Sequence, residues 1–108
     1  MHEPVVTLTA EELLAGAQAV HHVALPADLL GKSASGSVQI RPLTIGTFQL
    51  IMKAAKEDPG LIPLLMVKEC LTEPKLNIQQ VRDLPVGLVE FLVAQIRMMS
   101  GLTEKKTF

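Results

Sequence analysis

Aromatic residues are almost absent from this chain: three Phe, no Trp and no Tyr make up 3% of its 108 residues. Stacking platforms for single-stranded nucleic acid and antibody-like binding surfaces both depend on aromatic faces, so the composition disfavours them. Charge of one sign is also lacking, because 10 Lys and Arg stand against 11 Asp and Glu without a long run of either. A phosphate backbone is bound through a basic footprint, and we therefore expect no nucleic-acid partner.

Cysteine occurs once, at Cys70. A single thiol can form neither an internal disulfide nor a cysteine-based zinc site, which fits a reducing compartment and a core-filling role. Residues 1–14 carry acidic side chains in place of a basic segment and an apolar run, so no signal peptide is expected. The longest uncharged stretch, residues 13–27, is too short and too polar to span a bilayer. We expect a cytoplasmic protein without a membrane partner.

Apolar residues, in contrast, are plentiful at 48% of the chain. A disordered linker lacks such hydrophobicity, and the length fits one core, so we expect a single domain over residues 1–108. The mean hydropathy of +0.34 is high for a small chain, whose large surface normally has to be polar. Part of the apolar surface is therefore expected to contact another protein, either a client or further copies of the chain in a homo-oligomer.

The pattern predicts an α+β fold, mostly α. Over residues 1–19, Thr9 and Glu12 form a possible capping box before a helix from Ala10 to Ala19. Over residues 20–43, extended segments at 20–25 and 37–41 flank a stretch rich in turn-forming residues, which predicts a two-stranded β-hairpin with a long loop. The N-terminal helix and the hairpin are expected to precede a four-helix C-terminal bundle at 44–102 and a solvated tail at 103–108.

Four helix signals fill the C-terminal part. Thr44 is a plausible N-cap for a helix through Lys56, and an apolar helix is expected from Leu61 to Leu71. Asn77 with Gln80 predicts a capped short helix at 78–84. Pro85 suits the first position of a last helix that runs to Ser100, with Gly101 as the residue that ends it.

The last helix is the most informative for function. Between Leu84 and Leu102 the only charges are Glu90 and Arg97, which lie seven residues apart on one narrow stripe with Ala94 between them. A helix with so little polar surface either lies at the centre of its own bundle or faces a partner, and both can hold in a small domain.

Motifs for catalysis or metal binding are weak. Gly31-Lys32-Ser33 resembles the end of a phosphate-binding loop, but the leading Gly is replaced by Pro26 and a strand follows in place of a helix. His21 and His22 are adjacent on an expected strand and point to opposite faces, so they cannot readily share one ion. Pairing of Cys70 with a histidine stays open, although a lone helical Cys usually packs in the core. We expect no enzyme, no cofactor and no metal.

The order of parts resembles a known family. The chain has an extended segment that ends in Leu-Pro (Val23-Ala24-Leu25-Pro26), then a glycine-containing loop, and then the run 36–46 (GSVQIRPLTIG), which leads into a helix. This order is similar to the opening of tail and baseplate assembly chaperones. Those proteins occur in tailed phages and in phage-like contractile injection systems. The similarity covers residues 20–56 at the level of motifs and the remainder as a helical continuation. Several members are longer, which implies that part of the partner-binding surface is missing here or is supplied by another chain or by self-association.

The resemblance implies a non-catalytic helper that keeps an apolar or amphipathic helical client soluble, such as a tape-measure or baseplate protein. Apolar helical faces of the chain would cover the client, and Arg41 would orient polar contacts at the edge of the hairpin. A permanent structural subunit of the same kind of particle, such as a ring, adaptor or cap, is the alternative. The residues expected to contact the partner are Arg41, Phe48, Met52, Leu88, Phe91, Leu92, Ile96 and Met99.

Overall fold

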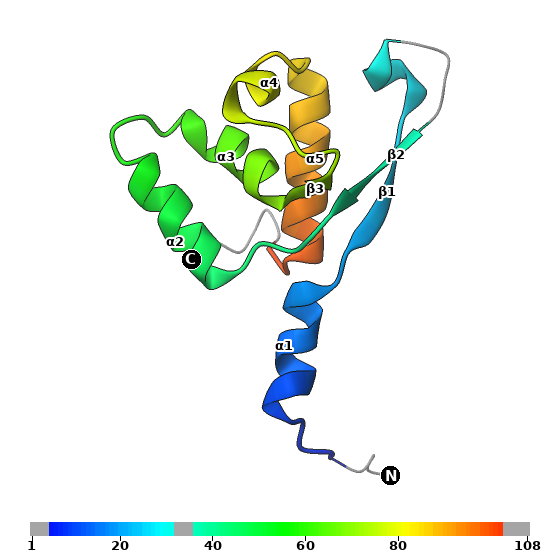
Figure 1. Cartoon of the computed structure of the whole chain (residues 1–108), viewed down its shortest axis with the longest axis vertical. Helices are drawn as coiled ribbons and strands as arrows, with labels where there is room; N and C mark the ends of the chain where they lie inside the picture. The colour runs from blue at the N-terminus through cyan, green and yellow to red at the C-terminus, as the bar shows by residue number, and fades with distance from the viewer. Residues whose placement is uncertain (1–4, 32–35, 103–108) are drawn as a thin grey trace.

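The structure, a computed structural model of the chain, describes residues 5–31 and 36–102 (Figure 1). Within these residues it contains five α-helices and a three-stranded antiparallel sheet, so the expected mixture of helix and strand, with helix in the majority, is confirmed. The expected tail at 103–108 and the Lys32-Ser33 part of the phosphate-loop comparison lie outside the described residues.

The first helix, α1 (Ala10–Gln18), begins where the capping box predicts it. The Thr9 hydroxyl accepts a hydrogen bond from the Glu12 N–H at 3.1 Å, and the Glu12 carboxylate accepts one from the Thr9 N–H at 3.0 Å. The backbone hydrogen bond from Thr9, followed by the one from its hydroxyl, holds the pKa of Glu12 below its ordinary value. α1 buries none of its residues and points away from the rest of the molecule (Figure 1).

The expected hairpin forms from β1 (His21–Leu25) and β2 (Gly36–Ile40). The strands pair antiparallel, with His21 opposite Ile40 and Leu25 opposite Gly36. A short 3-10 helix, η1 (Ala27–Leu30), follows β1 in the connection. η1 also packs against the last helix of the chain, so the tip of the hairpin is held over the helical part.

The expectation of a sheet with only two strands is wrong. A third strand, β3 (Leu71–Glu73), pairs antiparallel with β2 and places β2 at the centre of the sheet. The apolar pattern predicts helix through Leu71, but the helix ends at Cys70, whose carbonyl accepts the Arg41 N–H at 2.9 Å. Three residues are too few to show the alternation that marks a strand in a sequence, so only the tertiary pairing reveals it.

The four C-terminal helices form where they are expected, although they end slightly earlier. They are α2 (Ile45–Ala54), α3 (Leu61–Cys70), α4 (Ile78–Arg82) and α5 (Val86–Met99). Their packing is not the expected four-helix bundle, because α3 contacts α2, α4 and α5 while β3 separates α3 from α4 along the chain. The helices are therefore arranged around α3, with the sheet as an additional partner.

Polar groups define the helix ends. Thr44 caps α2 by accepting the Thr47 N–H at 3.2 Å, and the Asn77–Gln80 capping box begins α4 as predicted. Pro85, which is expected at the first helical position of α5, is its N-cap, and the helix begins one residue later at Val86. Gly101 has the left-handed backbone (φ 79°) that favours glycine after a helix.

The hydrophobic core lies where α3 and α5 meet the sheet and α4. Its most completely buried side chains come from all of these elements: Ile40, Val67, Cys70, Val81 and Ile96. The Leu43 N–H donates to the Ser100 Oγ at 2.7 Å, which joins the chain leaving β2 to the end of α5. No helix in residues 5–31 or 36–102 has both the length and the apolar character needed to cross a membrane.

Candidate functional site: an apolar groove beside the last helix

An open groove of about 480 Å³ lies between α4 and α5, with the first turn of α3 at its side. We call it the α4–α5 groove. Its walls are mostly aliphatic, with two arginines and one glutamate among them. The lining residues are Pro63, Leu64, Val81, Arg82, Leu84, Val86, Val89, Glu90, Val93, Ala94 and Arg97.

One face of α5 forms the long wall of the groove. Val86, Val89 and Val93 follow one another at spacings of three and four residues, which puts them on one side of a helix. The core face of the same helix carries Leu88 and Leu92, which are buried. Larger branched side chains of α5 thus lie in the core, while its smaller valines line the groove.

The opposite wall comes from α4 and the residues after it. Val81 is completely buried, and it stays at the base of the groove because the Asn77–Gln80 capping box fixes the first turn of this short helix. Leu84 and the first turn of α3, with Pro63, extend the apolar wall. The groove is therefore lined in part by a side chain of the hydrophobic core.

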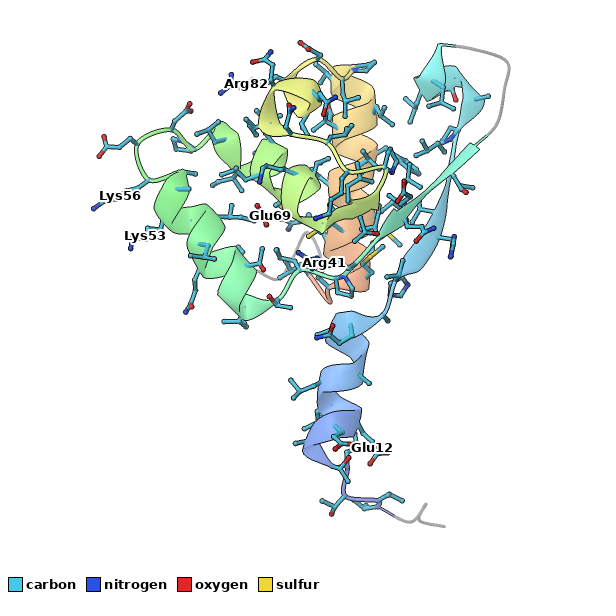
Figure 2. All side chains as sticks on the ribbon, viewed as in Figure 1. Glu12, Arg41, Lys53, Lys56, Glu69 and Arg82 are labelled. Atoms are coloured by element: carbon cyan, nitrogen blue, oxygen red, sulfur yellow. The ribbon has the colours of Figure 1, made fainter. Side chains whose placement is uncertain are left out.

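Charged groups lie at the edges of the groove. Arg82 on α4 is exposed and extends to the outside of the molecule (Figure 2). Glu90 on α5 is also exposed, and Arg97, about two turns further along the same stripe, is half-buried. An apolar floor with charged edges can bury the apolar side of an amphipathic segment while its polar side stays in water.

The residues predicted to contact a partner do not lie on one surface. Leu88, Leu92 and Ile96 on α5 are 7%, 2% and 0% exposed and belong to the core. Side chains buried to this degree cannot touch a partner unless α5 moves. Because they pack in the core, their loss is expected to reduce the free energy of unfolding.

The other five predicted residues have accessible surface but are dispersed. Met52 on α2 is exposed, and Phe48 lines a small recess that is bordered by Leu43 and Ser100. Phe91 is half-buried against the core, and Met99 lines a recess beside β1.

Arg41 joins β2 to the end of α3. Its Nε donates to the Glu69 carbonyl oxygen at 3.2 Å, and its side chain is exposed (Figure 2). Its contact within the chain ties the end of β2, the central strand, to α3. A role for Arg41 and the other dispersed residues in partner binding stays a prediction.

The candidate catalytic and metal-binding groups do not converge. His21 and His22 are both exposed on β1, whereas Cys70 is buried in α3. Burial raises the pKa of the Cys70 thiol to about 11, so the thiol is protonated and a poor nucleophile at neutral pH. Within residues 5–31 and 36–102 no three His, Cys, Asp or Glu side chains lie close enough to hold a metal ion.

Sequence reasoning missed most of the groove. Val86, Val89 and Val93 look like further core residues in a helix that is apolar on nearly every side. One signal in the sequence was the stripe of Glu90, Ala94 and Arg97, which marks the side of α5 that faces solvent. A second signal was that the valines and the leucines of this helix lie on different sides of it. The contribution of α3 could not be read locally, because tertiary packing brings Pro63 and Leu64 beside α5.

The fold and the groove define a small α+β protein with an open apolar groove on its surface. No protein-family model, curated protein or solved structure matches the chain.

Proposed function

We propose that the chain is a non-catalytic assembly chaperone or adaptor that binds an apolar or amphipathic helix of a client protein. The proposal places it in the cytoplasm, without a cofactor, during assembly of a phage tail or contractile injection system, where the client is a tape-measure or baseplate protein. The observation that carries the proposal is the α4–α5 groove, an open apolar recess of about 480 Å³ with charges at its edges.

The shape of the groove suits a helix. Its α5 wall extends from Val86 to Arg97, which corresponds to about 16 Å along a helix axis. Three turns of a client helix span a similar length, and apolar anchors at spacings of three and four residues would lie against the valines. Burial of such anchors releases water from both surfaces and is the main source of binding free energy.

A second apolar surface lies on α2. Ile45 and Met52 are exposed, and Phe48 lies between them on the same helical face. In the proposal this face, with Phe48 and Met52, extends the contact to a long client beyond the α4–α5 groove. Arg41 would contribute to recognition through polar contacts close to the end of β2.

A permanent structural subunit of the same kind of particle is the second candidate function. The observation in its favour is α1, which extends from the molecule with both of its leucines exposed (Figure 1). A projecting apolar helix suits an interlocking contact between neighbouring subunits in a ring or cap.

Co-expression with the neighbouring genes of the operon tests the proposal. Size exclusion with mass detection should recover a soluble complex with a long helical protein that is insoluble when it is expressed alone. A chain that never associates with such a protein would contradict the chaperone proposal. Recovery at fixed stoichiometry in purified particles would instead identify a structural subunit, because a chaperone is depleted from the finished assembly.

A further inference from the structure

Within residues 5–31 and 36–102, no other element buries the side chains of the N-terminal helix. α1 has nine residues, none of them buried, and isolated helices shorter than about 12 residues are marginal in water even when they are well capped. A capping box strengthens the first turn but does not cover apolar surface. The described residues of the chain therefore leave α1 without the packing that stabilises most protein helices, and a contact with a second molecule would supply it.

The surface that α1 offers is an apolar stripe. Ala10, Leu13, Leu14 and Ala17 follow one another at spacings of three and four residues, so they lie on one side of the helix. Leu13 and Leu14 are 67% and 64% exposed. The stripe is bordered on one side by Glu11 and Gln18, and thus α1 has the pattern of a helix that docks in an apolar groove.

The α4–α5 groove matches α1 in length and charge. Between its first and last residues α1 spans about 12 Å along the helix axis, and the α5 wall from Val86 to Arg97 spans about 16 Å, so the wall is long enough to hold α1. Glu11 borders the apolar stripe of α1, while Arg82 stands exposed at the edge of the groove. Opposite charges at the edge of an apolar contact favour association and fix its orientation.

The groove of the same chain is out of reach. α1 is joined to β1 only by Ala19 and Val20, so the last residue of α1 lies at most about 11 Å from the first residue of β1. β1 begins beside Met98 and Met99, on a side of α5 different from the one that lines the groove. A helix with its side chains is about 10 Å across, so the path around half of α5 is about 16 Å and exceeds the reach of the connection between α1 and β1.

We propose that α1 of one copy docks in the α4–α5 groove of a second copy, so that Leu13 and Leu14 contact the valine wall of α5. This inference rests on the proposed function, since it identifies what covers the same groove before a client arrives. A helical client would then have to displace α1. Self-association would therefore protect the apolar groove and oppose non-specific binding.

Cross-linking between two differently substituted copies tests the contact directly. One copy carries Ala17→Cys on the apolar stripe of α1, and the other carries Ala94→Cys at the groove. A short bismaleimide is added to the mixed full-length proteins. The matched control replaces Ala94→Cys by Ala54→Cys, because both alanines are exposed on helices but only Ala94 lines the groove. Native Cys70 is buried, and the unsubstituted protein measures its background.

The mixed sample should form at least tenfold more cross-linked heterodimer than the Ala54→Cys control. An equal yield in the two samples would overturn the inference. A cross-link that appears only within single chains carrying both Ala17→Cys and Ala94→Cys would overturn it as well, because α1 would then reach its own groove.

Sedimentation provides a second readout that does not depend on chemistry at cysteine. Leu14→Glu places a charge on the α1 stripe at a position that buries nothing in the monomer, so the fold is preserved. The unsubstituted protein should associate as its concentration rises, and Leu14→Glu should stay monomeric at the same concentrations. Unchanged association of Leu14→Glu would contradict the inference while leaving client binding by the groove intact, because neither measurement involves a client.

Discussion

Two neighbouring residues of α5 should respond very differently to truncation. Leu92 is 2% exposed in the core, whereas Val93 is half-buried on the wall of the α4–α5 groove. Leu92→Ala removes an isopropyl group from a closely packed site between helices, and such substitutions cost about 2–5 kcal/mol in free energy of unfolding. Val93→Ala removes two methyl groups that already border open space, so its cost should be about 1 kcal/mol or less.

The expected difference is large enough for a standard assay. A loss of about 3 kcal/mol lowers the melting temperature of a domain of this size by about 12 °C. Urea denaturation followed by circular dichroism gives the free energy of unfolding for both variants and the unsubstituted protein. A cost below about 1 kcal/mol for Leu92→Ala, or equal costs for the two variants, would refute the assignment of Leu92 to the core and Val93 to the groove.

Three further expectations concern single groups. Burial raises the pKa of Cys70 to about 11 from 9.0, so the folded thiol retains its proton where the unfolded one has lost it. The contribution of this thiol to the free energy of unfolding, measured by urea denaturation, should be constant below pH 9 and should decline from pH 9 toward pH 11. The Cys70→Ala variant should lack this decline. Ser100→Ala leaves the Leu43 N–H without its acceptor and should cost about 1–2 kcal/mol by the same assay. Thr9→Ala removes the cap of α1 and should speed amide exchange in that helix, measured by NMR, without changing global stability, because α1 buries nothing.

Local signals in the sequence were enough to locate most elements. Thr9 with Glu12, Thr44, and Asn77 with Gln80 each cap the helix that they predict, because capping depends on residues three positions apart. The extended segments on either side of η1 pair as the hairpin for the same reason, since their alternation and the turn residues between them are local.

Features that depend on tertiary packing could not be read in this way. β3 has three residues and is defined by its pairing with β2, including the Thr72 hydroxyl that donates to the Gln39 carbonyl at 3.0 Å. The predicted contact residues fail to form one surface because α5 is apolar on nearly all sides. Hydrophobicity alone therefore cannot distinguish Leu92 in the core from Val93 at the groove.

Client binding by the α4–α5 groove is most directly tested with two variants of α5. Val86 lines the groove and is 73% exposed, while Met98 lies elsewhere on the helix and is 70% exposed. Val86→Glu places an acidic group in the first turn, where the helix dipole favours it, and Met98→Glu places one near the last turn, where it is disfavoured. The control is therefore at least as destabilising to the helix as the groove variant.

The measurement is the affinity of each variant for the purified helical protein that co-purifies with the unsubstituted chain. Loss of an apolar anchor and burial of a charge at the contact should weaken binding at least tenfold for Val86→Glu, while Met98→Glu binds as the unsubstituted protein does. Equal affinity of Val86→Glu and the unsubstituted protein would contradict the assignment of the groove as the client-binding site.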